Sequence, residues 1–288
     1  MNATTLRSRV MNAAPKAGHT LKRRVLQGLR TDEFRVAYQG IYRVDTSELA
    51  QMEALIRWRH PEFGVLLPGS FHEALEDDEV IAELTDFVMN AVSHDIATLQ
   101  ASGACYPVAI NVPPSFASSE GFSERLQSVC DAHGVAPELI EIELSENQDL
   151  ARFPCIPKVV QRLRSRGVNV AMDDFGTGFA CLAALGPINF GTVKIAKELL
   201  AEAPRCPNAS TVFSSVLALL ARLKVKIVVE GVETPAQAQW LAQWPHVFAQ
   251  GFYLARPVFG MENVPGVRSP MLRNVKPHSA GVRLADAA

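Results

Sequence analysis

The stretch from Asn169 to Gly178, NVAMDDFGTG, is an apolar run that ends in two adjacent carboxylates, Asp173 and Asp174, and a glycine-rich turn. Aspartate is disfavoured inside strands, and neighbouring like charges repel each other. Bound metal would offset that cost, because a carboxylate pair can flank or bridge two ions about 3.5–4 Å apart. The glycines allow a sharp turn that brings backbone close to a ligand. The stretch therefore predicts a divalent-metal centre.

Polar side chains of similar chemistry recur near the carboxyl ends of the other apolar runs. They are Asn111, Glu143, Glu146, Lys194, Glu230, Glu233 and Gln250, while Glu53 lies early in its run and fits less well. Five or more carboxylates at one place would repel strongly without cations. All-oxygen ligands favour Mg²⁺ or Mn²⁺ over zinc, and a lysine among them would attract a phosphate oxygen.

Each of these residues also has a simpler interpretation when it is taken alone. Glu141 and Glu143 alternate with apolar residues, which is typical of a strand with one face in water, and this is the preferred interpretation of Glu141. Lys194 could bury only its stem, and Gln250 could be a satisfied polar residue near a turn. The recurrence of the pattern along the chain favours a shared site.

The elements that must position these residues alternate along the chain. Eight short apolar or β-branched runs lie at 34–44, 52–58, 107–112, 139–144, 168–175, 191–196, 226–233 and 247–257. Helical patterns fill most of the gaps, which predicts an α/β fold, a TIM-like (β/α)8 barrel. The linker between the first two runs is too short for a crossover helix, so we expect an antiparallel hairpin and one antiparallel strand. An open doubly wound sheet is the alternative, but no glycine-rich phosphate loop follows the first run.

Composition places the chain among ordinary globular proteins of 288 residues, 48% hydrophobic and 20% charged. No apolar run is long enough for a membrane span, and no signal peptide is evident. The five cysteines form no C-x-x-C pair, which argues against a disulfide framework or a zinc site and favours a reducing compartment. We therefore expect a cytoplasmic protein.

The charges divide the chain into three segments. Residues 1–30 contain seven Lys and Arg and no acid, whereas residues 31–260 carry a net charge of -11. The predicted organisation is a basic, flexible arm over 1–30, one domain over 31–260 and a disordered tail over 261–288. An acidic body without a nucleic-acid-binding motif argues against direct nucleic-acid recognition.

Together these residues resemble the EAL-domain family of cyclic di-GMP phosphodiesterases. EALIRW at 53–58 matches the signature that names the family, and RHPEFGVLLPGSF continues it. The further matches, in family order, are AINV (109–112), IELSE (142–146), DDFGTGF (173–179), VKI (193–195), VVEGVET (228–234) and QGFYLARP (250–257). YQGI (38–41) resembles the segment before the signature, and the likeness covers about residues 33–258.

The resemblance implies a barrel with one antiparallel strand that hydrolyses cyclic di-GMP to linear pGpG with two Mg²⁺ or Mn²⁺ ions. It implies metal ligation by Glu53, Asn111, Glu143, Asp173 and Asp174, with Glu230 at the metal centre or activating the water. Lys194 would hold the attacking water. Substrate binding would involve Gln39 at a guanine and Arg57 at a phosphate, together with Leu55, Glu233 and Gln250. Glu146 would brace the loop after DDFGTG, which in this family lies at the dimer interface, so a homodimer is expected.

The chain departs from the family pattern most clearly at Ala196, where the family usually has an aspartate after Lys-Ile. Loss of a carboxylate beside a metal commonly costs 10–100-fold in affinity or activity. Milder departures are Gly40 for a usual proline, Pro113 for a usual serine, and Ala180-Cys181 where two serines are common.

Two functions compete. The first is a phosphodiesterase, with activity reduced by Ala196. The second is a degenerate, stand-alone EAL protein that binds cyclic di-GMP or docks a protein partner to control gene expression. We favour the enzyme, because the other expected ligands are present. An unrelated metal hydrolase on the same barrel is a third, weaker alternative.

Overall fold

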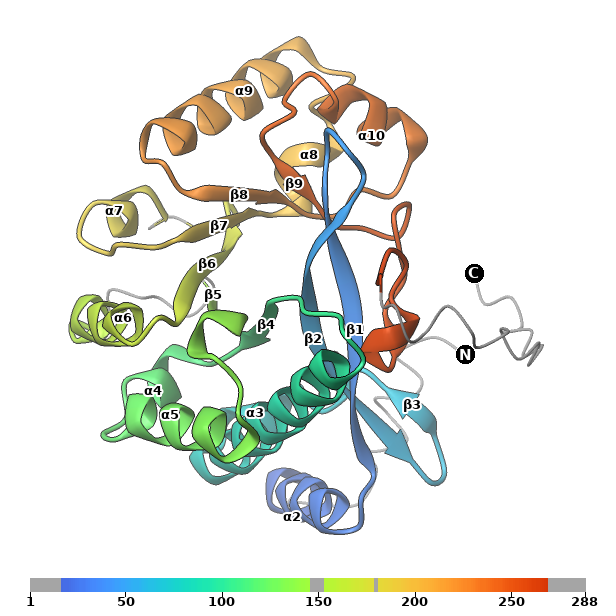
Figure 1. Ribbon diagram of the computed structural model, residues 1–288, viewed down its shortest axis with the longest axis vertical. Coiled ribbons are helices and arrows are strands. Elements are labelled where there is room, and N and C mark those ends of the chain that lie inside the picture. The colour runs from blue at the N-terminus through green and yellow to red at the C-terminus, as the bar shows by residue number, and fades with distance from the viewer. Residues whose placement is uncertain (1–16, 146–152, 179–180, 269–288) are drawn as a thin grey trace.

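The computed structural model describes residues 17–145, 153–178 and 181–268. Strands β1 (Phe34–Arg43) and β2 (Leu49–His60) form an antiparallel hairpin, in one register from Phe34 opposite Trp58 to Ile41 opposite Gln51, after which the register shifts by one residue. This confirms the predicted hairpin. Figure 1 shows it running through the length of the molecule.

Eight strands close into a barrel in the order β1-β2-β4-β5-β6-β7-β8-β9. Strand β1 is antiparallel to both neighbours, and the other pairs within the ring are parallel. The predicted (β/α)8 barrel with one antiparallel strand is therefore confirmed. The remaining ring strands are β4 (Val108–Asn111), β5 (Ile140–Ser145), β6 (Asn169–Phe175), β7 (Thr192–Ile195), β8 (Lys226–Val229) and β9 (Phe248–Ala249). Short strands β3 (Gly64–Leu66) and β10 (Val258–Phe259) pair outside the ring with β2 and β1.

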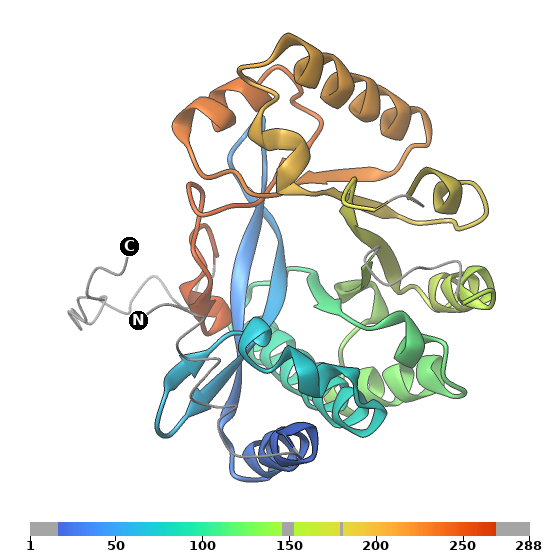
Figure 2. The same cartoon turned by 180° about the vertical axis from the view of Figure 1, so that it is seen from behind.

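Helices surround the barrel, as Figures 1 and 2 show from its two sides. They are α3 (Asp78–Ala101), α4 (Pro114–Ala117), α5 (Phe122–His133), α6 (Ile156–Ser165), α7 (Cys181–Leu185), α8 (Lys197–Ala201), α9 (Pro207–Arg222) and α10 (Pro235–Leu241). Short 3₁₀ turns are η1 (Pro68–Ser70), η2 (His72–Glu76), η3 (Pro137–Leu139) and η5 (Met261–Asn263). No helix among the described residues combines the length and apolar character that crossing a membrane requires.

The strands are buried on both faces, which explains their continuous apolar runs. Outward-facing side chains such as Ile110, Ile142 and Val193 are fully buried in one cluster together with residues of the surrounding helices. Burial of this kind contributes about 25 cal/mol per Å² of apolar surface. The inward face is different, because it carries most of the buried polar side chains, and these form the layers described below.

The predicted flexible arm is wrong for residues 17–30, which form helix α2 (Ala17–Arg30). Val25 is fully buried in a second apolar cluster with Phe34, Trp58 and Phe71, which lies beyond the barrel rim. Arg24 pairs with Glu33 at 2.6 Å. The basic charge hid an amphipathic helix, whose apolar residues recur every four positions and pack into this cluster, although its basic residues are spread around the helix. Residues 1–16 lie outside the described residues.

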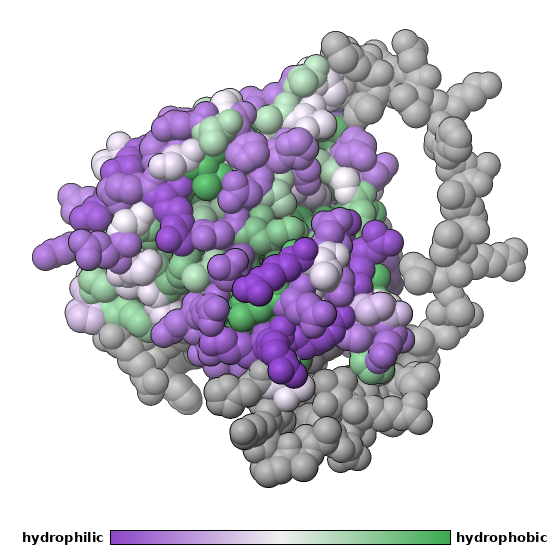
Figure 3. All heavy atoms as spheres, turned by 90° about the horizontal axis from the view of Figure 1, so that it is seen from below, coloured by the Kyte–Doolittle hydropathy of each residue, from purple (hydrophilic) through white to green (hydrophobic). Residues whose placement is uncertain are grey.

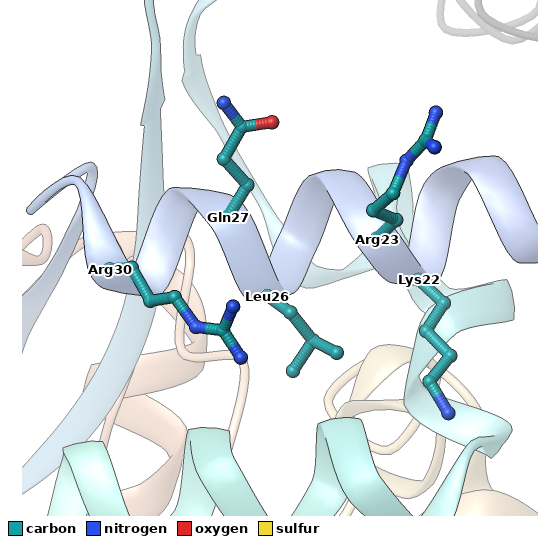
Figure 4. Close-up of a pocket in the computed structure, with 5 residues that line it drawn as sticks. All are labelled: Lys22, Arg23, Leu26, Gln27 and Arg30. Atoms are coloured by element: carbon teal, nitrogen blue, oxygen red, sulfur yellow. The ribbon is translucent and has the colours of Figure 1, made fainter.

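A cavity of about 470 Å³ runs along α2 and is lined by that helix alone among the described residues (Figure 4). Its lining side chains are Lys22, Arg23, Leu26, Gln27 and Arg30. No acid or nucleophile belongs to it, so it offers no catalytic chemistry. Lys22 is itself paired with Asp77 and Glu79 of the segment where α3 begins.

The predicted disordered tail is wrong for its first residues, because Met261 and Val264 are buried against the barrel. Arg268, the last described residue, lies 3.3 Å from Glu48 in the turn between β1 and β2. Residues 269–288 lie outside the described residues. Figure 3 shows a surface of mostly polar residues, with hydrophobic ones in small separate areas.

Candidate metal centre

Lys194 occupies the centre of a buried group of four carboxylates inside the barrel. Its Nζ lies 2.8 Å from Glu230 Oε1, 2.9 Å from Glu143 Oε1, 3.1 Å from Asp173 Oδ1 and 3.4 Å from Glu53 Oε2. These five side chains, here called the carboxylate layer, come from strands β2, β5, β6 and β7 and from the residue after β8. The structure therefore brings together residues that the sequence placed at separate strand ends, and it adds Glu53, which lies early in its run.

Three amides orient the carboxylate of Glu53. Asn111 Nδ2 donates to one of its oxygens at 2.8 Å, and Gln250 Nε2 donates to the other at 2.6 Å. Gln250 Nε2 also lies 3.1 Å from Gln39 Oε1, and Gln39 in turn donates to the carbonyl of Ala255. Two residues assigned to substrate binding thus take part in a chain of amides that leads to Glu53.

Several oxygens of the layer have no hydrogen-bond donor. Both carboxylate oxygens of Glu143 and Oδ1 of Asp173 are buried and accept no hydrogen bond from the described residues. Lys194 Nζ forms ion pairs with Glu143 Oε1 and with Asp173 Oδ1. Buried polar atoms are normally hydrogen-bonded, so an orphaned carboxylate calls for an explanation such as an ion. The donor set, carboxylates with one amide oxygen, fits Mg²⁺ or Mn²⁺.

The burial of so many acids shifts their protonation. Burial raises the pKa of Glu230 to about 8, against the opposing effect of Lys194, and neighbouring acids add to the rise. Burial likewise holds the pKa of Glu143 well above its ordinary value. Burial alone would lower the pKa of Lys194, but the four carboxylates outweigh it and raise that pKa. For Glu53, Lys194 and the two amides outweigh burial and lower the pKa.

Asp174 has a backbone conformation that non-glycine residues seldom adopt. Its φ is +57°, and the chain turns immediately after it. Oxygens of Asp173, Asp174 and Glu230 lie within 4.8 Å of one another, a spacing that one or two metal ions can span. Ser145 Oγ is 3.4 Å from Asp174 Oδ2. The adjacent aspartates are thus aimed at a common point, as the opening motif predicted.

Two cavities of different character adjoin the carboxylate layer. One of about 380 Å³ is apolar, lies between β2, α3 and the β4–α4 turn, and includes Leu55, Asn111 and Glu143. The other, of about 320 Å³, is polar and includes Gln39, Glu53, Asp174, Glu230, Glu233 and Gln250. Arg57 follows on β2, donates to the carbonyl of Ile56, and has its pKa lowered by burial. The predicted substrate residues therefore surround the layer.

Sequence reasoning missed the two further charged residues of the polar cavity and misjudged one strand residue. Lys197 and Glu198 line that cavity, and their position directly after β7 was the available signal. The wet-face interpretation of Glu141 is wrong, because this side chain is 3% exposed and points into the barrel with its oxygens hydrogen-bonded. Glu146 lies outside the described residues, so its expected role stays a prediction.

Comparison with known proteins matches residues 22–257 to the family model described as the EAL domain. The chain belongs to the EAL-domain family. It is 30% identical over 233 residues to the cyclic di-GMP phosphodiesterase NbdA of Pseudomonas aeruginosa, covering 81% of this chain and 30% of that one. It is 31% identical over 240 residues to the probable cyclic di-GMP phosphodiesterase PdeN of Escherichia coli, covering 82% and 46%.

Solved structures give the same family. The PaMucR phosphodiesterase in complex with c-di-GMP superposes with a TM-score of 0.77 at 26% identity, covering 83% of this chain and 97% of that one. The chain spans between about a third and a half of the curated relatives cited above. The likeness therefore concerns their EAL portion.

Two departures from the EAL pattern have a visible local setting. Ala196 is 1% exposed and lies between β7 and α8, two residues after Lys194 of the carboxylate layer. At Gly40, a Cβ would overlap the ring of Tyr42, whose hydroxyl donates to the carbonyl of Pro265 at 2.9 Å. The glycine thus accommodates a tyrosine that holds the segment after β10 to the barrel.

Proposed function

We propose that this EAL domain is a metal-dependent phosphodiesterase that hydrolyses cyclic di-GMP to linear pGpG. The observation that supports this most directly is the convergence of four carboxylates on the single cation Lys194, beside cavities that Glu143 and Glu230 help to line. Such a set is unfavourable in a protein that binds no cation. The names of the relatives supply the nucleotide as the candidate substrate.

The residues that would hold Mg²⁺ or Mn²⁺ are Glu53, Asn111, Glu143, Asp173, Asp174 and Glu230. When bound, such ions lower the pKa of a water and neutralise charge on a phosphate. Glu230 lines the polar cavity 2.8 Å from Lys194, a position suited to accepting a proton from the attacking water. Lys194 holds the carboxylates together and orients the water, and Gln250 and Asn111 keep Glu53 in place.

Substrate binding is assigned to the surroundings of the layer. Arg57 is suited to a phosphate, and Gln39, Leu55, Glu233 and Gln250 to the rest of the dinucleotide. In the reaction, water adds to phosphorus, the opposite P–O ester bond breaks, and the leaving 3′ oxygen takes a proton. The product is a linear dinucleotide with a 5′ phosphate. A homodimer and a cytoplasmic location remain predictions.

A second candidate function rests on one observation, the buried Ala196 at the end of β7. A site that lacks a carboxylate there would bind metal weakly and serve as a cyclic di-GMP receptor, or dock a protein partner, in the control of gene expression. The two functions differ in turnover. In the enzyme, Ala196→Asp raises activity about 10–100-fold at limiting metal.

The test is a turnover assay with purified protein, cyclic di-GMP, and Mg²⁺ or Mn²⁺, in which pGpG is followed by chromatography. Glu53→Gln abolishes product if the proposal is right, while Glu62→Gln, at an exposed position in the turn between β2 and β3, leaves it unchanged. No product from wild type or Ala196→Asp, with cyclic di-GMP still bound in equilibrium dialysis, would favour the receptor. Neither turnover nor binding would refute both functions that involve the nucleotide.

A further inference from the structure

A second polar layer lies inside the barrel beneath the carboxylate layer. It consists of Gln51, Glu141, Asn169, Thr192 and Lys226, and is here called the lower layer. Glu141 Oε1 accepts from Gln51 Nε2 at 2.7 Å, and its Oε2 accepts from Thr192 Oγ1 at 2.6 Å and from Asn169 Nδ2. Lys226 Nζ donates to Gln51 Oε1, which connects the only base of this layer to its only acid.

The lower layer joins strands that do not touch through their backbones. Glu141 on β5 is bonded to Gln51 on β2, although β4 lies between these strands. Gln51 is bonded to Lys226 on β8, although β1 and β9 lie between them. Backbone ladders fix only neighbouring strands, so these side chains supply cross-links through the barrel interior.

Each residue of the lower layer precedes a residue of the carboxylate layer on its own strand or, for Glu230, directly after it. Side chains two positions apart along a strand share one face and differ in height by about 6.8 Å. The pairs two positions apart are Gln51–Glu53, Glu141–Glu143 and Thr192–Lys194, and the pairs four apart are Asn169–Asp173 and Lys226–Glu230. In the first three pairs the lower residue directly precedes the upper one on the inward face, whereas Ala171 and Val228 lie between the members of the other two pairs.

The lower layer is not itself a ligand site. None of its buried side-chain polar atoms lacks a hydrogen-bond partner, and none of its residues lines the cavities described above. Gly191 permits the close packing, because a Cβ there would overlap the amide of Asn169. A fully bonded cluster with one positive and one negative charge is suited to rigidity rather than to exchange with a ligand.

We propose that Glu141 and Lys226 are positioning residues for the metal centre, holding the strands so that the carboxylates above them converge. The proposal rests on the proposed metal dependence, and it is new in assigning a role to the part of the barrel that touches neither metal nor substrate. A metal site whose ligands are poorly held by their neighbours binds metal more weakly, even though all the ligands are present. We expect the lower layer to govern metal affinity.

The test compares Mn²⁺ affinity in Glu141→Gln, Lys226→Met and a control of similar stability. Val92→Ala is the control, because Val92 is fully buried on α3 and belongs to neither layer. The Mn²⁺ dissociation constant is measured by titration calorimetry without nucleotide, at a temperature well below the unfolding of every variant. We expect a 10–100-fold weaker Mn²⁺ affinity in the two lower-layer variants and less than a twofold change in Val92→Ala.

Thr192→Val provides a milder variant, since it removes one donor to Glu141 and keeps the side-chain volume. It should weaken Mn²⁺ binding by a smaller factor, and it keeps the test decisive if Glu141→Gln does not fold. Activity lost at low Mn²⁺ and recovered at high Mn²⁺ would support positioning. Equal Mn²⁺ affinities in wild type and folded lower-layer variants would overturn the inference, and so would a wild type without Mn²⁺ binding. A wild type that binds Mn²⁺ but forms no pGpG refutes the proposed enzyme and leaves this comparison valid.

Discussion

The two polar layers of this barrel use similar residue types to opposite effect. In the lower layer one acid faces one base through an amide, and the buried polar atoms are hydrogen-bonded. In the carboxylate layer four acids face one lysine, and oxygens of Glu143 and Asp173 remain without donors. Unsatisfied polar groups, rather than buried polar groups as such, therefore mark the place prepared for a ligand.

The largest expected effect comes from removing the one cation of the carboxylate layer. Lys194→Met leaves four acids of the layer without a cation, which should lower the unfolding free energy of the metal-free protein by about 3–5 kcal/mol. The measurement is urea denaturation in EDTA. Added Mn²⁺ should recover part of the loss if the layer is a cation site. Unchanged stability of Lys194→Met in EDTA would show that the carboxylates are neutral. The two layers would then differ less in charge balance than their contacts indicate.

A pH series probes the same contrast through Glu230, whose pKa in the folded protein is raised to about 8. An unfolded glutamate titrates near pH 4.3, so between about pH 4 and 8 the folded state binds more protons at this site. The contribution of Glu230 is therefore fully present at low pH and is lost as pH rises through about 8. The unfolding free energy of metal-free protein should fall over this range by at most about 1.4 kcal/mol per pH unit.

The control for the pH series is Glu230→Gln, which should have a flatter profile in EDTA. Mg²⁺ binds the deprotonated carboxylate, so it should stabilise the wild type more at pH 9 than at pH 6. Parallel pH profiles for wild type and Glu230→Gln would contradict the assigned titration.

The smallest expected change in stability has opposite signs in the two layers. Glu143→Gln removes a buried carboxylate whose pKa is raised by burial, so at pH 8 in EDTA it should stabilise the protein by about 1 kcal/mol. Glu141→Gln should destabilise the protein, because the NH₂ group of the new amide would face side chains that also donate hydrogen bonds. Thermal melts with and without Mn²⁺ measure both, and the stabilisation by Mn²⁺ should disappear in Glu143→Gln. If both substitutions destabilise the protein, the carboxylate layer is not less satisfied than the lower layer, and the distinction between the two layers is wrong.

The sequence allowed the barrel, the hairpin and the convergence of the strand-end acids to be predicted, because apolar runs, a short linker and strand-end chemistry are local signals. Glu141 was misjudged because alternation shows only that two faces differ. In a barrel the outer face lies under helices, so the face with polar residues is the inside. Helix α2 was missed because its basic charge drew attention away from Leu21, Val25 and Leu29, which are spaced four apart.

Contacts across the barrel interior could not be predicted from the sequence, because they depend on the relative heights of strands that are not neighbours. Glu53 illustrates this, since it seemed too early in its run to reach the site. Strand β2 continues past the rim to pair with β3, so the middle of the strand, not its end, is level with the site. The sequence indicated a long β2, but it did not indicate that the end of β2 extends beyond the barrel rim.

The reversed direction of β1 determines on which side of the barrel attached groups would lie. Because β1 begins opposite the far end of β2, helix α2 lies on the same side as the carboxyl ends of the parallel strands. Arg268 instead contacts the β1–β2 turn at the opposite side. A bulky label attached to α2 would therefore lie on the entrance side of the barrel, whereas one attached at Arg268 would lie on the opposite side.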